Sequence, residues 1–462
     1  YARIEIFKNH FYIKEYDENV YEIIYKLKRY AESGIKNYTH SVDLWMKNSG
    51  LIIDCDEKKN ALRNLFKNSK VAFIYGAAGT GKSTMINYIS SLFKDKQKIF
   101  LANTNPAVEN LRRKVTAEHA EFVTITKFFS KDVSNDCDIL CLDECSTISN
   151  RDMVRVLQRA QCKLLVLVGD IYQIESILFG NWFNIAYKVM PKDSVAELTR
   201  PHRTTVQGLI EVWNKVREIT EDRLEFITRN GLSSTLDESI FSRTEEDEIV
   251  LCLNYDGIYG INNINKFLQS NNVNPSINWG VLSYKVGDPV LFNESNRFAP
   301  LVYNNLKGKI LQIEEEEDCI YFTIEVYTVL NELDVIGFDL ELKESVTDET
   351  SVIRFKVGRG GDGNDDNDNV ENVVPFQVAY AISIHKAQGL EYESVKVVIT
   401  SEIEEMVSHN IFYTAITRAK SKLKIYWSPE TEKRILENMK VQFNDKDYQL
   451  FKAKYKEALL KS

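Results

Sequence analysis

The chain has 462 residues, of which 44% are hydrophobic and 27% are charged, and its formal net charge is −9. The composition is that of a globular protein, and the length predicts two to four domains. The negative charge excludes nucleic-acid binding through bulk electrostatic attraction, but it is compatible with a channel lined locally by donors and aromatic rings. No stretch approaches the ~18 uninterrupted apolar residues of a membrane span, so we expect no membrane partner.

The seven cysteines are an odd number without a C-x-x-C pair, which is typical of free thiols in a reducing cytoplasm. Cys137, Cys141 and Cys145 recur every four residues, but they straddle a predicted strand and its end. We interpret them as small buried side chains rather than cluster ligands. A cytoplasmic location is expected.

Residues 1–66 mix charged and aromatic side chains, with Tyr21, Ile24, Leu27 and Tyr30 at helical spacing. This pattern predicts a helical or mixed segment ahead of the first domain. We expect this segment to be available to a protein partner.

Short apolar runs alternate with amphipathic segments from about residue 67 to residue 200, which predicts a parallel sheet with crossover helices. The predicted strands are Val71–Tyr75, Ile99–Ala102, Asp138–Leu142 and Leu164–Val168. Residues 76–84, GAAGTGKST, follow the first strand and fit the phosphate-binding pattern G-x-x-x-x-G-K-[ST]. A helix is predicted next, at Met85–Leu92.

This loop predicts a site for a nucleoside triphosphate, because backbone N–H groups surround phosphates at the start of a helix. Lys82 would reach the β- and γ-phosphates, and Ser83 would ligate Mg²⁺. The loop residues expected to bind the nucleotide are Gly76, Gly79, Thr80, Gly81, Lys82, Ser83 and Thr84.

Polar side chains follow two later strands of the same predicted sheet. Asp143 and Glu144 come directly after Asp138–Leu142, where a parallel sheet would present them to the same nucleotide. Asp143 would hold Mg²⁺, and Glu144 would orient and deprotonate the attacking water. Gln173 follows the next strand and would hydrogen-bond the γ-phosphate or that water. Farther along, Arg203 and Arg418 would stabilise charge on the leaving phosphoryl group.

A second α/β set is predicted from the strands Glu248–Leu253, Val395–Thr400 and Lys422–Trp427. Residues 279–372 interrupt this set with alternating strands such as Gly308–Ile313 and Ile320–Val329, which predict an inserted small β-barrel.

Two segments of biased composition lie in the predicted insert. The acidic run Glu314–Asp318 predicts a solvated hairpin tip, and Gly358–Asn372 predicts a flexible linker.

The ordered motifs resemble the signature of superfamily 1 helicases. Residues 379–391, AYAISIHKAQGLE, are similar to the motif AyAiT-x-HKxQGxE of the RecD-like branch. Asn103–Val108 and Val123–Phe128 are similar to the segments that grip one strand, and Val286–Val290 with residues 304–310 resembles the SH3-like barrel of RecD-like and Dda-like enzymes. The resemblance covers roughly residues 55–428.

The resemblance implies an α/β fold with two RecA-like P-loop domains, each with a parallel sheet, and an inserted SH3-like β-barrel. The expected parts are an N-terminal segment at residues 1–66, a first RecA-like domain at 67–200, the two parts of a second at 201–278 and 373–462, and the barrel at 279–372.

The resemblance also implies roles for single residues. ATP would lie between the two RecA-like domains, with Arg203 and Arg418 at the γ-phosphate and Glu391 at the ribose hydroxyl. Gly389 is a further residue expected to bind the nucleotide. The residues expected along a single-stranded nucleic-acid track are Thr104, Asn105, Thr124, Ser383 and His385. The implied direction of movement is 5′ to 3′.

The sequence departs from the family pattern at two places. Family enzymes read adenine with a glutamine in a pattern like Gln-x-x-Ala-Leu, whereas here Lys58 precedes Ala61 and Leu62. We therefore expect weak discrimination between ATP and GTP. The region Ser130–Cys137 is too short for the β-hairpin that splits a duplex in RecD-like helicases, so we expect translocation to be better than unwinding.

The leading hypothesis is a helicase or translocase that couples hydrolysis of ATP, with Mg²⁺, to movement along single-stranded DNA. One alternative is an RNA-directed relative, as in Upf-like proteins. Another is a nucleotide-gated DNA-sensing ATPase subunit of a larger complex, for example in antiviral defence.

Overall fold

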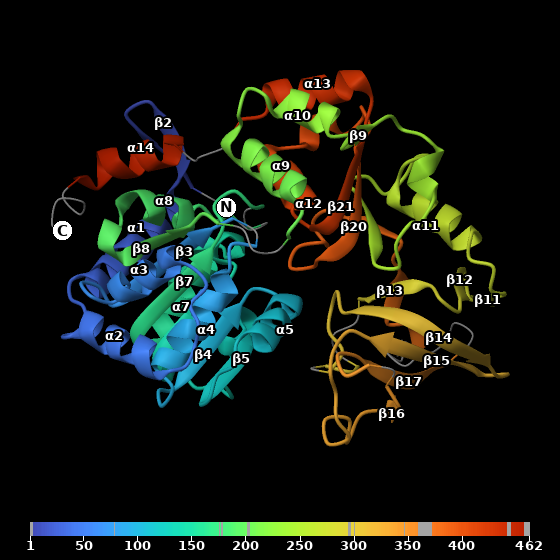
Figure 1. The fold of residues 1–462 in the computed structure, drawn as a ribbon, viewed down its shortest axis with the longest axis horizontal. Helices are drawn as coiled ribbons and strands as arrows, with labels where there is room; N and C mark the ends of the chain where they lie inside the picture. The colour runs from blue at the N-terminus through green and yellow to red at the C-terminus, as the bar shows by residue number, and fades with distance from the viewer. Residues whose placement is uncertain are drawn as a thin grey trace. The chain divides into compact units, whose positions relative to one another are not determined.

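The computed structural model describes residues 3–456, except for 78, 175, 177–178, 201–203, 294–296, 300, 346, 359–371 and 441–444. The chain divides into two compact units (Figure 1). Unit 1 comprises Tyr1–Glu221, Ser408–Thr417 and Met439–Ser462, and unit 2 comprises Asp222–Val407 and Arg418–Asn438.

Unit 1 contains a six-stranded sheet in the order β5-β4-β6-β7-β3-β8, in which every neighbouring pair is parallel. The strands are β3 (Val71–Gly76), β4 (Lys98–Ala102), β5 (Ala120–Thr124), β6 (Asp136–Leu142), β7 (Gln161–Gly169) and β8 (Val195–Leu198). All four predicted strands of this region are therefore confirmed, with ends that differ by at most three residues.

Helices cover both faces of this sheet, because its strands are apolar on both sides. Phe73 and Tyr75 belong to one buried core, whereas Ala72 and Ile74 belong to the other. The α-helices of unit 1 among the described residues are α1 (Lys14–Ala31), α2 (Tyr38–Asn48), α3 (Asp56–Asn64), α4 (Lys82–Leu92), α5 (Asn105–Lys114), α6 (Ile125–Phe128), α7 (Asn150–Arg159), α8 (Trp182–Val189), α9 (Gln207–Glu218), α12 (His409–Ile416) and α14 (Asp445–Lys454).

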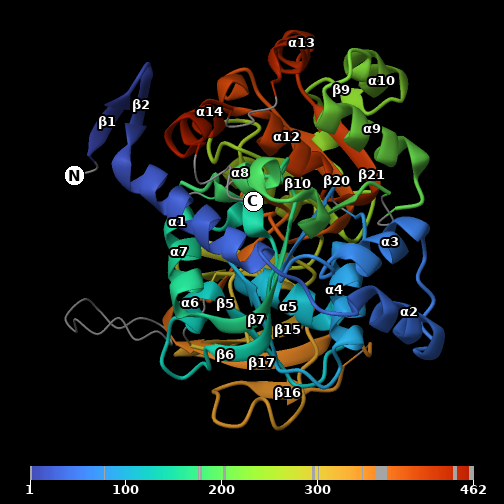
Figure 2. The same cartoon turned by 90° about the vertical axis from the view of Figure 1, so that its left-hand side faces the viewer.

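Helix α1 is an integral part of unit 1, which differs from the separate segment expected at residues 1–66. Ile24 and Leu27 are fully buried in the same core as the sheet, and α1 packs against α7 (Figure 2). The Tyr455 hydroxyl donates to Asp17 at 2.6 Å, which joins α1 to the segment after α14. Before α1, a hairpin of β1 (Ile4–Phe7) and β2 (His10–Ile13) extends beyond the end of the helix (Figure 2).

The border between the units also differs from the expected border at residue 200. Helix α9 belongs to unit 1, where its Trp213 Nε1 donates to the Ile416 carbonyl of α12 at 3.0 Å. The α9 side chains Leu209, Val212 and Val216 are buried. Helix α9 therefore packs on α12, and α12 is joined to the loop after β7 by the hydrogen bond from the Ile174 amide to Thr414 Oγ1, so both helices belong to unit 1.

Unit 2 contains a five-stranded parallel sheet in the order β19-β10-β20-β21-β9. Its strands are β9 (Ser233–Ser234), β10 (Glu248–Cys252), β19 (Ala381–Ser383), β20 (Tyr392–Val398) and β21 (Ala419–Tyr426), and its helices are α10 (Arg223–Arg229), α11 (Ile261–Ser270) and α13 (Pro429–Asn438). The three strands predicted here are confirmed.

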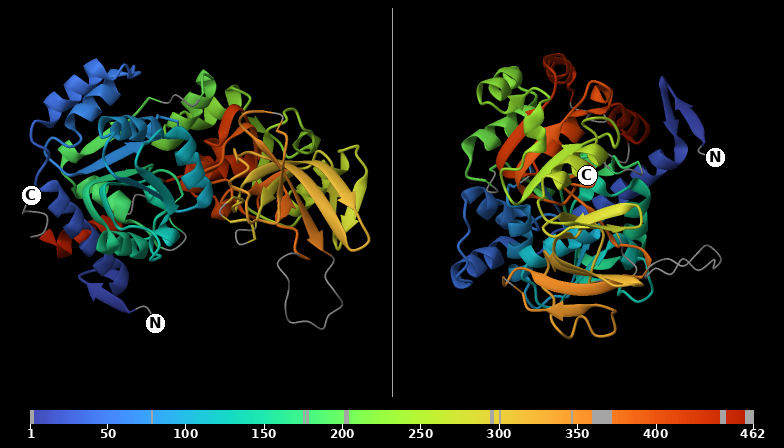
Figure 3. Two further views of the ribbon diagram at one scale, coloured as in Figure 1. Left: turned by 90° about the horizontal axis from the view of Figure 1, so that it is seen from below. Right: turned by 90° about the vertical axis from the view of Figure 1, so that its right-hand side faces the viewer.

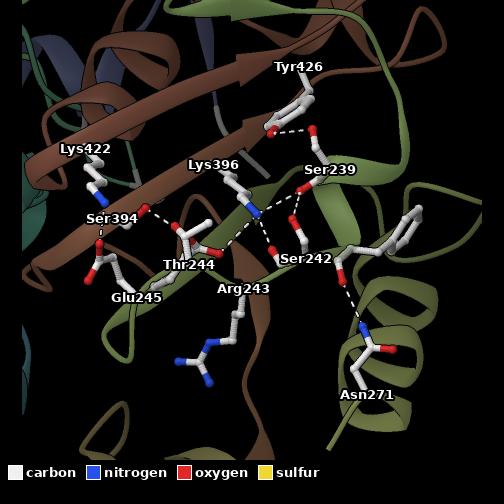
Figure 4. A network of polar contacts seen from close by, with 12 residues as sticks. Ser239, Ser242, Arg243, Thr244, Glu245, Asn271, Ser394, Lys396, Lys422 and Tyr426 are labelled. Atoms are coloured by element: carbon white, nitrogen blue, oxygen red, sulfur yellow. Dashed lines mark hydrogen bonds and ion pairs between the residues drawn. The ribbon is translucent and has the colours of Figure 1, made fainter.

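A buried polar network attaches strand β20 to the segment 239–248 (Figure 4). Lys396 Nζ donates to the Ser239 carbonyl at 2.9 Å and lies 3.1 Å from a Glu248 carboxylate oxygen. The other Glu248 oxygen accepts from Thr244 and Ser394, each at 2.9 Å. Both members of the ion pair are buried, since their side chains are 7% and 2% exposed.

The insert in unit 2 forms an antiparallel six-stranded sheet in the order β16-β17-β15-β14-β13-β18 (Figure 3). Its strands are β13 (Pro289–Phe292), β14 (Lys307–Glu315), β15 (Cys319–Val326), β16 (Glu341–Lys343), β17 (Ser351–Gly358) and β18 (Phe376–Val378), and a hairpin of β11 (Ser276–Trp279) and β12 (Leu282–Lys285) precedes them. Alternate side chains of β15 enter an aromatic-rich core. The likeness to an SH3-like barrel stays a prediction.

The acidic run is only partly a turn. Glu314 and Glu315 lie within β14, and Glu314 forms an ion pair with Arg354 of β17, so the turn itself is limited to residues 316–318. The predicted linker lies almost wholly outside the described residues, at 359–371.

Candidate functional site

The predicted nucleotide-binding residues of unit 1 gather at one edge of its sheet. Because all six strands are parallel, their carboxyl ends face the same side. The phosphate loop follows β3, Asp143 follows β6 and Gln173 follows β7, and these three strands are neighbours in the order β6-β7-β3. The sheet therefore brings together residues that are far apart in the sequence.

The phosphate loop is shaped by glycines at positions where a side chain would not fit. A Cβ atom on Gly76 would lie 2.4 Å from Thr80 Oγ1, and Gly79 and Gly81 have φ angles of 77° and 85°. Thr80 is buried and donates to the Ala77 carbonyl at 3.0 Å. Gly81 precedes the first residue of α4, so backbone N–H groups and the positive end of the helix dipole are available to an anion.

Lys82, Ser83 and Thr84 form the first turn of α4. The Lys82 ammonium lies over the loop, where it donates to the carbonyl oxygens of Gly76 and Ala77 at 2.8 and 2.9 Å. An incoming phosphate would replace these carbonyls as the partner of a charged donor.

Asp143 and Glu144 stand at the end of β6. The Asp143 amide is fixed by the Leu101 carbonyl of the neighbouring strand at 2.9 Å, and one Asp143 carboxylate oxygen accepts the Glu144 amide at 2.9 Å. Glu144 has a φ of 52°, a left-handed conformation that is uncommon for a residue other than glycine and costs about 1 kcal/mol. Burial raises the pKa of the Asp143 carboxyl, against the opposing effects of the Glu144 N–H and the Lys82 ammonium.

The loop after β7 carries Gln173 and a buried aspartate to which sequence reasoning gave no role. Asp170 is 3% exposed, one of its oxygens accepts the Tyr172 amide at 3.0 Å, and the other has no hydrogen-bond partner among the described residues. The Gln173 amide donates to the Asp170 carbonyl at 3.3 Å. The next residue, Ile174, donates to Thr414 Oγ1 of α12 at 3.1 Å.

This donor set fits Mg²⁺ together with a nucleotide. Among the residues that the structure describes, no group of three His, Cys, Asp or Glu side chains is arranged to hold a metal ion. Mg²⁺ commonly needs only one or two protein ligands, since phosphates and water supply the others. Ser83 and Asp143 would supply those ligands, and the free Asp170 oxygen offers a further acceptor at the same sheet edge.

The residues expected at the ribose and γ-phosphate fall partly in unit 2. Arg418 is 3% exposed, and its guanidinium donates to the Leu390 carbonyl at 3.2 Å, between Gly389 and Glu391. Gly389 has a φ of 76°, so this turn requires a glycine. Unit 2 thus brings Gly389, Glu391 and Arg418 together, whereas Arg203 lies outside the described residues.

Three of the predicted strand-contacting residues lie at the same sheet edge of unit 1 as the phosphate loop. Thr104 and Asn105 are exposed after β4, and Thr124 ends β5, where it lies opposite Ala102. Both threonines cap helices, since Thr104 Oγ1 accepts the Ala107 amide at 3.4 Å and Thr124 Oγ1 accepts the Lys127 amide at 3.2 Å.

In unit 2, Ser383 is the last residue of β19, and His385 lies two residues after it. Ser383 is buried and its hydroxyl accepts the Lys386 amide at 3.2 Å, so its first role is to shape the turn. His385 is exposed and therefore accessible to a ligand.

Family models match two parts of the chain. Residues 55–237 match the AAA domain family, and residues 378–426 match the UvrD-like helicase C-terminal domain. The RecBCD enzyme subunit RecD of Buchnera aphidicola is 23% identical over 503 residues, which cover 84% of this chain and 78% of that protein. The ATP-dependent DNA helicase Pif1 of Campylobacter jejuni is 23% identical over 438 residues, which cover 77% of this chain and 88% of that protein.

Together, the family models and these relatives support a superfamily 1 helicase of the RecD/Pif1-like type. The fold is also similar: a structure of Pif1 helicase from Bacteroides in complex with ADP-AlF3 and ssDNA aligns over 87% of this chain and 98% of that chain, with a TM-score of 0.51 and 16% identity. The chain spans only 37% of another relative, the uncharacterized protein MJ1519 of Methanocaldococcus jannaschii, which is 24% identical over 448 residues.

Proposed function

We propose that this chain hydrolyses a nucleoside triphosphate, ATP in the first instance, to move along single-stranded DNA, in the 5′ to 3′ direction. The observation that carries the proposal is the gathering of Lys82, Asp143, Glu144 and Gln173 at one edge of one parallel sheet. The relative named as an ATP-dependent DNA helicase supports DNA as the polymer.

The side chains divide the chemistry among them. Lys82 would neutralise the β- and γ-phosphates, Asp143 and Ser83 would hold Mg²⁺, and Glu144 would accept the proton of the attacking water. Gln173 contacts the γ-phosphate, and its loop is bonded through Ile174 to Thr414 of α12, near Arg418 in the sequence. A change at Gln173 on hydrolysis would therefore reach α12 through one hydrogen bond.

The strand track is proposed to use Thr104, Asn105 and Thr124 in unit 1 and His385 in unit 2. The exposed positions of Thr104, Asn105 and His385 support this role. Ser383 would contribute only through the turn that presents His385.

The test is the ATPase rate with single-stranded DNA, with single-stranded RNA and without polymer, for the wild type and for Lys82→Ala. We expect DNA to raise the wild-type rate by at least 10-fold and Lys82→Ala to be inactive throughout. Equal rates with and without both polymers would refute the motor, and stimulation by RNA alone would replace DNA with RNA.

We propose that the isolated chain translocates better than it unwinds. Residues 129–135, all of which are described, contain no strand between α6 and β6, so this segment offers no wedge. The measurement is displacement of a streptavidin block from single-stranded DNA beside unwinding of a tailed duplex. Processive unwinding by the chain alone would contradict the proposal.

A protein partner is proposed to bind the N-terminal hairpin. Ile4, Ile6 and Phe11 are 68%, 65% and 75% exposed on β1 and β2, and such apolar groups favour a protein contact. The relative named as a RecBCD enzyme subunit supports a setting in a complex. No helix among the described residues has the length and apolar character needed to cross a bilayer.

A further inference from the structure

Lys58 is a fully buried lysine whose ammonium lies against the phosphate loop. It belongs to α3 and is 0% exposed. A Cβ atom placed on Gly81 would lie 2.5 Å from Lys58 Nζ, 3.0 Å from its Cε and 3.6 Å from Thr84 Oγ1. The ammonium therefore lies at the loop backbone, beside the first turn of α4.

The charge environment of this ammonium favours an anion. Gly81 is the residue before α4, so Lys58 Nζ lies at the positive end of an eleven-residue helix. A cation is unfavourable there, and a buried lysine needs a partner of opposite charge. That partner is Asp54, whose carboxylate oxygen lies 2.5 Å from Nζ and whose side chain is 38% exposed. Two lysines, Lys58 and Lys82, thus approach the loop.

We propose that Lys58 is a second lysine that stabilises the phosphates bound at this site, and that it leaves the base of the nucleotide unread. The inference rests on the proposed function, because it assumes that the loop binds a nucleoside triphosphate. A phosphate held by the loop gives the charge of Lys58 an anion in addition to Asp54 and relieves the unfavourable interaction between that charge and the helix dipole. Because Lys58 is 0% exposed, it acts on the phosphate through its charge, from beside Gly81, rather than by direct contact.

The position and chemistry of Lys58 both argue against a base-reading role. A lysine ammonium has three donors and no acceptor, so it has no group that accepts from the amino group of adenine. Its Nζ also lies at the backbone of the loop that would hold the phosphates. The substrate class that follows is nucleoside triphosphates in general, with ATP, GTP and CTP bound at similar affinity.

The experiment measures binding of ATP, GTP and inorganic tripolyphosphate to the full chain by calorimetry, for the wild type, Lys58→Met and Lys59→Met. Tripolyphosphate has no base and so isolates contacts to phosphate. We expect Lys58→Met to weaken the binding of all three ligands by the same factor, about 10- to 100-fold, since a positive charge beside the phosphate loop is lost. Lys59 is the control, because it is on the same helix but 40% exposed and paired with Asp56, and its substitution should change nothing.

Two results would overturn the inference. Unchanged tripolyphosphate affinity with altered ATP or GTP affinity would make Lys58 a base reader, and unchanged affinity for every ligand would leave it a structural residue. A second variant, Asp54→Asn, removes the competing carboxylate and should strengthen tripolyphosphate binding, whereas weakening or no change would contradict the proposal. If no ligand binds even to the wild type, the proposed function fails; if ATP binds and GTP does not, only this inference fails.

Discussion

The buried ion pair between Lys396 and Glu248 predicts a large loss of stability in Lys396→Met (Figure 4). The substitution leaves the Glu248 carboxylate, 2% exposed, without its cation, and it also removes the lysine donor from the Ser239 and Ser242 carbonyls. Breaking a buried pair in this way costs about 3–5 kcal/mol. At about 2–4 °C per kcal/mol for a unit of this size, the melting temperature of unit 2 should fall by about 6–20 °C.

The assay is urea and thermal denaturation of the full chain, with Lys422→Met as the matched control. Lys422 pairs with Glu245 in the same network (Figure 4), but its side chain is 58% exposed, so its substitution should leave the melting temperature unchanged within error. The double variant Lys396→Met/Glu248→Gln should recover part of the loss, because it no longer buries a lone charge.

A free energy of unfolding of Lys396→Met within about 1 kcal/mol of the wild type would show that the buried pair is not a major source of stability. The same would follow if the double variant were as unstable as the sum of the two single variants, since the charges would then be independent.

Three further predictions concern unit 1. Because burial raises the pKa of Asp143 above 3.8, its ionised form opposes folding at pH values above the raised pKa and has no effect below 3.8. Asp143→Asn should therefore have a higher melting temperature than the wild type at pH 7 without Mg²⁺, and this difference should vanish as the pH falls toward 3.8. A difference in melting temperature that grows on acidification would contradict this prediction. Leu27→Ala should destabilise unit 1 by about 2–5 kcal/mol, whereas Tyr25→Ala, on the exposed face of α1, should change little; equal effects in urea denaturation would show that α1 is not part of the core. Thr104→Ala removes a 3.4 Å capping bond and should cost only about 0.5 kcal/mol, so a larger loss of DNA affinity, measured by fluorescence anisotropy, would be due to the strand contact itself.

The parallel sheets were predictable from the sequence because their signal is local. A strand buried on both faces is continuously apolar, as in Val71–Gly76, and the polar residues that follow such strands mark the carboxyl edge. The phosphate loop, Asp143 and Gln173 could therefore be assigned to one edge of the sheet from the sequence.

The assignment of helices to units could not be predicted in this way, because it depends on packing between distant segments. The spacing of apolar residues predicted helix α1 but not its position in the core of unit 1. Likewise, the motif that contains Thr414 and Arg418 reads as one segment, yet α12 packs on α9 in unit 1 while Arg418 belongs to unit 2.

Lys58 shows a different limit. The sequence revealed only that a glutamine was missing at this position, because burial beside Gly81 results from the packing of α3 against α4. The left-handed conformation of Glu144 was equally invisible, since nothing in its neighbours requires a positive φ.

The interleaving of the two units has a practical consequence for anyone who wishes to study them separately. The chain passes from one unit to the other at residues 221/222, 407/408, 417/418 and 438/439. Cutting the chain at one place therefore yields no fragment that holds a whole unit and nothing else. A fragment that ends at residue 221 lacks α12 and its bond to Trp213, and an isolated unit 2 has to bridge the ten residues 408–417 with a linker.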